Sequence, residues 1–132
     1  MDEYKIIGID PGLKSTGYGI VTVIEKKIFY MASGKITTNP KDEESVRLKD
    51  IFQGISEIVT KFQPSMAVVE KIFVNINASS TLALGQARGV AIAALANHQI
   101  QIQELTPLEI KKSIVGTGKA DKRQVQFMIK EL

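Results

Sequence analysis

The chain has 132 residues, of which 44% are hydrophobic and 23% are charged, and it contains no cysteine. This length is typical of one domain that buries its own core, and the composition excludes a disordered chain. The lack of cysteine excludes a disulfide framework and a thiolate metal site. No apolar run is long enough for a membrane span, and the N-terminus has no signal-peptide pattern. We therefore expect a cytoplasmic protein without a membrane partner.

The net charge of +3 is unevenly distributed. Residues 1–106 carry 11 basic and 11 acidic side chains, whereas residues 107–132 carry six basic and three acidic ones. A concentrated basic surface favours a polyanionic partner such as DNA, because binding releases counterions. On charge alone, a solvated lysine-rich helix face is the simpler interpretation.

Three strand-like runs open the chain, at residues 5–10, 17–24 and 27–38. Pro11-Gly12 closes the first run as a turn, and Glu25-Lys26 joins the other two. The pattern predicts an antiparallel meander of three strands.

The middle of the chain predicts a helix followed by a buried strand. Apolar residues recur at helical spacing from Leu48 to Phe62, and Pro64 ends this pattern. The short apolar run at residues 66–70 is typical of a buried strand. Because it follows a helix, we expect a crossover connection that places this strand parallel to an earlier one.

Residues 78–97 predict a second helix that is apolar on nearly every side. Such a helix must be covered on several sides, by its own domain or by a second subunit. A strand is expected at residues 100–105, a third helix from Pro107 to about Gly118, and a last helix from Asp121 to the chain end. The element order predicts one α/β domain over residues 1–132 with a mixed sheet.

Two acidic residues, Asp10 and Glu70, each end an apolar strand-like run. A carboxylate there is costly unless it is paired, hydrogen-bonded or bound to a cation. If the two strands are neighbours, both side chains reach one point at the edge of the sheet, where oxygen ligands suit Mg²⁺. Alternatively, Asp10 caps the Pro11-Gly12 turn and Glu70 pairs with Lys71 or Arg88.

A series of motifs runs through the whole chain. It comprises Gly8-Ile-Asp10-Pro-Gly12, Thr16-Gly-Tyr-Gly19, Arg47-Leu48, Glu70 with Phe73, Leu84-Gly-Gln-Ala-Arg-Gly-Val-Ala91, Lys111, Val115-Gly-Thr-Gly118, Ala120-Asp-Lys122 and Gln124-Val-Gln126. In this order the series resembles the RuvC family of Holliday-junction resolvases. The first motif alone is not specific, because sugar-kinase-like and actin-like ATPases open in a similar way.

The resemblance implies an RNase H-like fold, with a mixed five-stranded sheet (three antiparallel strands, then parallel ones) flanked by helices. It also implies a homodimer that binds four-way junction DNA and cuts it by paired symmetric nicks in DNA recombination and repair. Hydrolysis would use two metal ions, with Mg²⁺ as the first choice and Mn²⁺ as the alternative, and a branch-migration motor would be a partner.

The resemblance also implies roles for individual residues. Asp10 and Glu70 match two of the four acidic metal ligands. Lys111 and Lys122 match basic catalytic residues that hold the scissile phosphate and the DNA backbone, and Phe73 matches an aromatic residue that stacks on a base near the crossover. The predicted DNA-binding set is Phe73, Lys111, Lys112, Lys119, Lys122 and Arg123.

The chain departs from the family pattern at its end. The other two acidic ligands of the family belong to a C-terminal helix that is expected beyond Gln126, and neither Asp121 nor Glu131 matches them. We therefore expect a truncated chain that binds metal weakly and cleaves junctions slowly or not at all. One alternative is a catalytically inactive junction-binding module. Another is an actin-like nucleotide-binding domain, but the chain is too short for its second phosphate loop and adenosine pocket.

Overall fold

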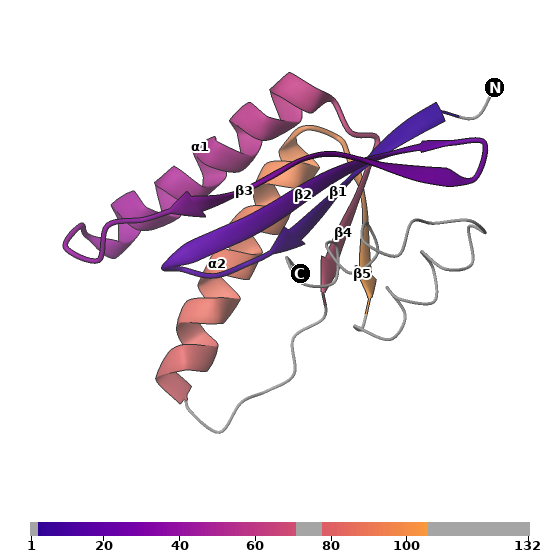
Figure 1. The fold of residues 1–132 in the computed structure, drawn as a ribbon. Coiled ribbons are helices and arrows are strands. Elements are labelled where there is room, and N and C mark those ends of the chain that lie inside the picture. Colours follow the sequence, from indigo (N-terminus) through magenta and orange to yellow (C-terminus); the bar gives the residue numbers. More distant parts are fainter. Residues whose placement is uncertain (1–2, 71–77, 106–132) are drawn as a thin grey trace.

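The computed structural model describes residues 3–70 and 78–105, which form five strands and two helices (Figure 1). The strands are β1 (Glu3–Asp10), β2 (Ser15–Ile24), β3 (Lys27–Thr37), β4 (Met66–Glu70) and β5 (Gln101–Leu105), and the helices are α1 (Glu44–Phe62) and α2 (Ala78–Asn97). The order of these seven elements agrees with the prediction. The two helices predicted after Pro107 lie outside the described residues.

The strands form one mixed sheet in the order β3-β2-β1-β4-β5. The three N-terminal strands pair antiparallel, whereas β4 lies parallel to β1 and to β5. This arrangement follows from the connections, because hairpins join antiparallel strands and a helical crossover is needed between parallel ones. The predicted meander and the predicted parallel strands are both confirmed.

The element ends differ from the prediction by a few residues. Strand β1 begins at Glu3 and β2 at Ser15, and α1 begins at Glu44, one turn before the apolar stripe. The stripe marks only the buried side of α1, so it cannot show a polar first turn. At its other end, Gln63 adopts a left-handed conformation and donates its N–H to the Val59 carbonyl, so this cap ends the helix just before Pro64.

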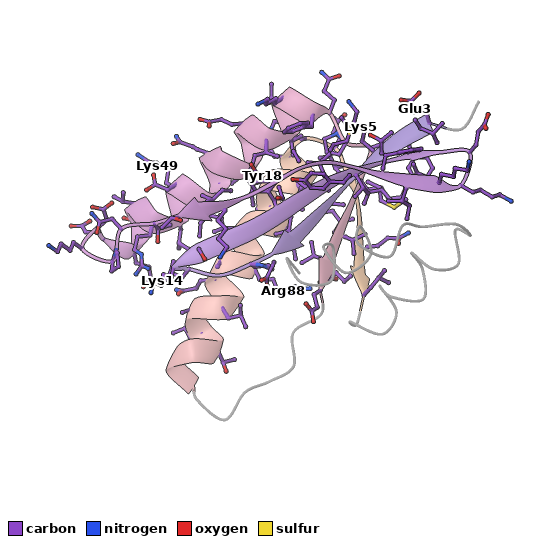
Figure 2. All side chains as sticks on the ribbon, in the orientation of Figure 1. Glu3, Lys5, Lys14, Tyr18, Lys49 and Arg88 are labelled. Carbon is purple, nitrogen blue, oxygen red and sulfur yellow. The ribbon has the colours of Figure 1, made fainter. Side chains whose placement is uncertain are left out.

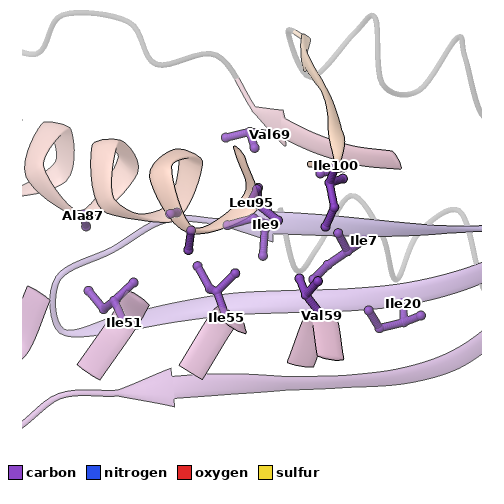
Figure 3. Close-up of a cluster of buried hydrophobic side chains, with 13 residues drawn as sticks. Ile7, Ile9, Ile20, Ile51, Ile55, Val59, Val69, Ala87, Leu95 and Ile100 are labelled. Carbon is purple, nitrogen blue, oxygen red and sulfur yellow. The ribbon is translucent and has the colours of Figure 1, made fainter. Parts of the chain in front are cut away.

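Helices α1 and α2 pack on the same face of the sheet, which we call the helix face, and enclose the main core (Figure 3). The core residues are at most 8% exposed and comprise Ile7, Ile9, Ile20, Ile51, Ile55, Val59, Ala67, Val69, Ala87, Ala91, Ala94, Leu95 and Ile100. Side chains alternate along a strand, so the residues between these positions point to the opposite side, which we call the second face.

Within residues 3–70 and 78–105, helix α2 packs against the rest of the domain on one side and is exposed on another. Ala87, Ala91 and Ala94 are fully buried in the core, whereas Leu82 is 64% exposed and Gly85 and Gly89 are exposed as well. Neither α1 nor α2, the helices of the described residues, is long and apolar enough to cross a membrane.

Candidate active site

Asp10 and Glu70 end two strands that lie side by side in the sheet. In the parallel pairing of β1 with β4, Ile9 is the partner of Val69, and the two carboxylates follow directly on each strand. Neighbouring strands are about 4.8 Å apart. Because Ile9 and Val69 are both in the core on the helix face, Asp10 and Glu70 both point to the second face. The expected adjacency of the two strands is confirmed.

Both carboxylate residues are half-buried, and burial raises the pKa of Glu70 above its ordinary value of 4.5. Desolvation has this effect because it disfavours the charged form of a carboxyl group. A nearby cation acts in the opposite direction and favours the carboxylate. A divalent cation at this strand end would therefore compete with the proton on Glu70 and lower its pKa.

Arg88 does not pair with Glu70, so that alternative for Glu70 is wrong. The Arg88 guanidinium forms an ion pair with Glu104 of β5. Glu104 is the partner of Val69 in the β4–β5 register and so points to the helix face, the side opposite to Glu70. Lys71, the other proposed partner, lies outside the described residues.

Thr16 closes the turn that follows Asp10. The Gly12 N–H donates to Thr16 Oγ1 at 3.2 Å, and the Thr16 hydroxyl donates to the Gly12 carbonyl at 2.8 Å. A Cβ atom at position 12 would collide with the backbone carbonyl of Ser15, so the turn requires glycine there. These contacts fix the chain direction immediately after Asp10.

A second set of hydrogen bonds, which we call the Thr38 tether, connects this turn to the start of α1. The Thr38 N–H donates to the Lys14 carbonyl at 3.0 Å, and its hydroxyl donates to the Leu13 carbonyl at 2.6 Å. Arg47 Nε in turn donates to Thr38 Oγ1 at 2.9 Å. Thr38 is only 3% exposed, so its hydroxyl depends on these partners. Figure 2 labels Lys14 in the turn.

The sequence marked Arg47 as part of a motif but gave it no role, and it gave no indication of Thr38. Neither residue belongs to an apolar stripe or an acidic cluster, and their contact joins positions nine residues apart across a loop. Only the three-dimensional structure brings them to the turn after Asp10.

The other predicted site residues cannot be placed. Phe73, Lys111, Lys112, Lys119, Lys122 and Arg123 all lie outside the described residues. Within the described part of the chain, no group of three or more histidine, cysteine, aspartate or glutamate residues could hold a metal ion. The described site thus offers two carboxylates, a number that suits Mg²⁺, which commonly takes one or two from the protein and completes its shell with water and phosphate oxygens.

The sheet order, the helix positions and the paired acidic strand ends define an RNase H-like α/β fold, as predicted. A protein-family model described as crossover junction endodeoxyribonuclease RuvC matches residues 6–132. The chain is 49% identical over 128 residues to the crossover junction endodeoxyribonuclease RuvC of Dechloromonas aromatica (strain RCB), covering 97% of this chain and 72% of that protein. The chain belongs to the RuvC family.

Further comparisons agree with this assignment. The RuvC of Neisseria meningitidis serogroup C is 47% identical over 128 residues, covering 97% of this chain and 72% of that protein. Among solved structures, T. thermophilus RuvC in complex with Holliday junction substrate matches with a TM-score of 0.77 and 25% identity, over 95% of this chain and 76% of that one. The yeast mitochondrial Holliday junction resolvase Ydc2, with a TM-score of 0.56 and 15% identity over 92% of this chain and 68% of that one, supports the fold alone.

Proposed function

We propose that this chain is a structure-selective endonuclease that hydrolyses phosphodiester bonds in four-way DNA junctions by paired symmetric nicks. The observation that carries the proposal is the adjacency of Asp10 and Glu70 on one face of an RNase H-like sheet, in a chain that belongs to the RuvC family. The relative bound to a Holliday junction supports the substrate class.

Asp10 and Glu70 would hold divalent cations, with Mg²⁺ as the physiological ion and Mn²⁺ as a substitute. When bound, a pair of such ions about 4 Å apart stabilises the attacking and leaving oxygens of the phosphodiester. The protein's own contribution is position. Strands β1 and β4 set the spacing of the carboxylates, and the Thr38 tether holds the turn that follows Asp10. Small errors in such positions cost large factors in rate.

The remaining site residues belong to the proposal as predictions. Lys111 and Lys122 would hold the scissile phosphate, the neighbouring basic residues would bind the DNA backbone, and Phe73 would stack on a base at the crossover. The cytoplasmic location and the branch-migration motor as partner also stay predictions.

A homodimer is part of the proposal, because two sites are needed for two nicks. The exposed side of α2 supports it, with Leu82, Gly85, Gly89 and Ala93 recurring at helical spacing on the surface. A Cβ atom built at Gly85 or Gly89 meets nothing within 4 Å, so a second helix has room to approach closely there. An apolar helix face of this kind is typical of a subunit contact.

A gel-shift experiment tests the proposal. A labelled four-way junction and a duplex of equal length are titrated with the chain without divalent ions, over a range of salt concentrations. We expect the junction to bind more tightly, with an affinity that decreases steeply as salt is raised. Equal binding of junction and duplex would contradict the substrate assignment.

Cleavage is then measured with Mg²⁺ and Mn²⁺, and Asp10→Asn serves as the matched control. Paired nicks that disappear in this variant support the endonuclease. Selective junction binding without any cleavage, in a protein that binds no Mn²⁺, would instead support the alternative of an inactive junction-binding module.

A further inference from the structure

Lys35 of β3 lies in the same cross-strand row as the two carboxylates. Asp10 is the partner of Gly17 in the β1–β2 pairing, and Gly17 is the partner of Lys35 in the β2–β3 pairing. Glu70 continues the row on β4, because Ile9 pairs with Val69 one position earlier. The row therefore contains two acidic residues, a glycine and a lysine on four successive strands.

The Lys35 side chain points to the second face, as the two carboxylates do. Its neighbour Gly34 faces the helix side, since a Cβ atom built there would lie 2.7 Å from Tyr18 Oη, and Tyr18 packs against the core. Its other neighbour, Ile36, also packs against the core and contacts Gly54 of α1. Side chains alternate along a strand, so Lys35, which lies between two residues on the helix face, points to the second face.

Gly17 leaves the space between Lys35 and Asp10 free of any β2 side chain in this row. Two strand spacings put the Cα atoms of Lys35 and Asp10 about 10 Å apart. The lysine side chain is long and flexible and covers much of this distance. Its ammonium group can therefore lie beside the carboxylates without being fixed to them.

The Lys35 side chain is exposed, and its ammonium group makes no ion pair or hydrogen bond with any residue in the described part of the chain. A positive charge on this side of the sheet also offsets the repulsion between the two carboxylates and a negatively charged DNA strand. It is thus available to a phosphate that lies over the same face.

We propose that Lys35 binds the DNA phosphate next to the scissile one and so places the cut strand over Asp10 and Glu70. This inference rests on the proposed function. It adds a phosphate contact from the antiparallel part of the sheet to the basic residues predicted between Lys111 and Arg123. The contact carries no sequence preference, because phosphate contacts set position and base contacts set specificity.

The test compares Lys35→Gln with Lys27→Gln, a matched control. Lys27 is an exposed lysine at the opposite end of the same strand, eight residues away. Binding of a fluorescent four-way junction is followed by anisotropy without divalent ions, between 50 and 200 mM KCl. We expect Lys35→Gln to lower the slope of log K against log salt by about 0.9 for each subunit that contacts the DNA. Lys27→Gln should keep the wild-type slope, and Lys35→Arg should keep most of the affinity.

A wild-type slope and affinity in Lys35→Gln would overturn the inference, and so would an equal loss in Lys27→Gln, which would indicate a general charge effect. The proposed function fails separately, if the wild-type chain does not prefer the junction to the duplex. A scan of junctions with one neutral methylphosphonate each locates the contact. When the methylphosphonate replaces the phosphate that Lys35 contacts, the wild type and Lys35→Gln should bind the junction with equal affinity. If no position of the methylphosphonate gives equal affinities, the inference is contradicted.

Discussion

Replacing Thr38 with valine tests the tether between α1 and the turn after Asp10. Valine has nearly the shape of threonine but removes the hydroxyl that donates to the Leu13 carbonyl and accepts from Arg47 Nε. Thr38 is 3% exposed, so its partners lose hydrogen bonds that water replaces only in part. We expect the free energy of unfolding to decrease by about 1–3 kcal/mol. For a chain of this size, each kcal/mol lowers Tm by about 3–5 °C.

The assay is urea unfolding of the wild type, Thr38→Val, Arg47→Met and the double variant, with Thr38→Ser as the variant that keeps the hydroxyl. If Arg47 acts through the Thr38 hydroxyl, the two losses are not additive, and the coupling is about 0.5 kcal/mol or more. Amide exchange at Gly12 should also become faster in Thr38→Val, because the turn is held less firmly. Additive losses, together with unchanged exchange at Gly12, would refute the tether.

Three further predictions concern the rest of the site and the α2 surface. Because burial raises the pKa of Glu70, its carboxyl group binds a proton more readily in the folded than in the unfolded chain. Without metal, stability should therefore decrease as pH rises above about 4.5, and Glu70→Gln should flatten the profile of urea midpoint against pH in EDTA. An unchanged profile would contradict this. In the same assay, Glu104→Gln should destabilise the protein more than Arg88→Met does, because loss of the Glu104 carboxylate leaves the mostly buried Arg88 guanidinium without its ion pair. A larger loss in Arg88→Met would show that the packing of the Arg88 side chain matters more than the ion pair. Gly89→Leu should shift a dimer to monomers in light scattering with little change in Tm, whereas a persistent dimer would place the subunit contact elsewhere.

The sequence predicted the elements well because their signals are local. The apolar stripe of α1 and the run before Glu70 each show which side is buried, and the helix between β3 and β4 implies the parallel pairing of β4. The adjacency of Asp10 and Glu70 follows from these patterns and from the crossover rule. The small residues of α2 were more ambiguous, since only the structure separates buried Ala87 and Ala91 from exposed Gly89.

Contacts that depend on register or on loops could not be predicted. Arg88 was one of two partners considered for Glu70, but the alternation of β5 brings Glu104 to the helix face, where it pairs with Arg88. The row that aligns Lys35 with Asp10 depends on the pairing of three strands, which no single stretch of sequence encodes. The Thr38 tether likewise depends on how the loop before α1 returns to the turn.

The most direct test of the shared cation site is a Mn²⁺ titration of the metal-free protein, followed by electron paramagnetic resonance. The variants are Asp10→Asn, Glu70→Gln and their combination, with Glu57→Gln on the exposed surface of α1 as the control. We predict that each single site variant loses the same tightest-bound Mn²⁺, that the double variant loses nothing further, and that the control binds as the wild type does. Wild-type Mn²⁺ affinity in either single variant, or independent and additive losses in the two, would contradict a cation shared between β1 and β4.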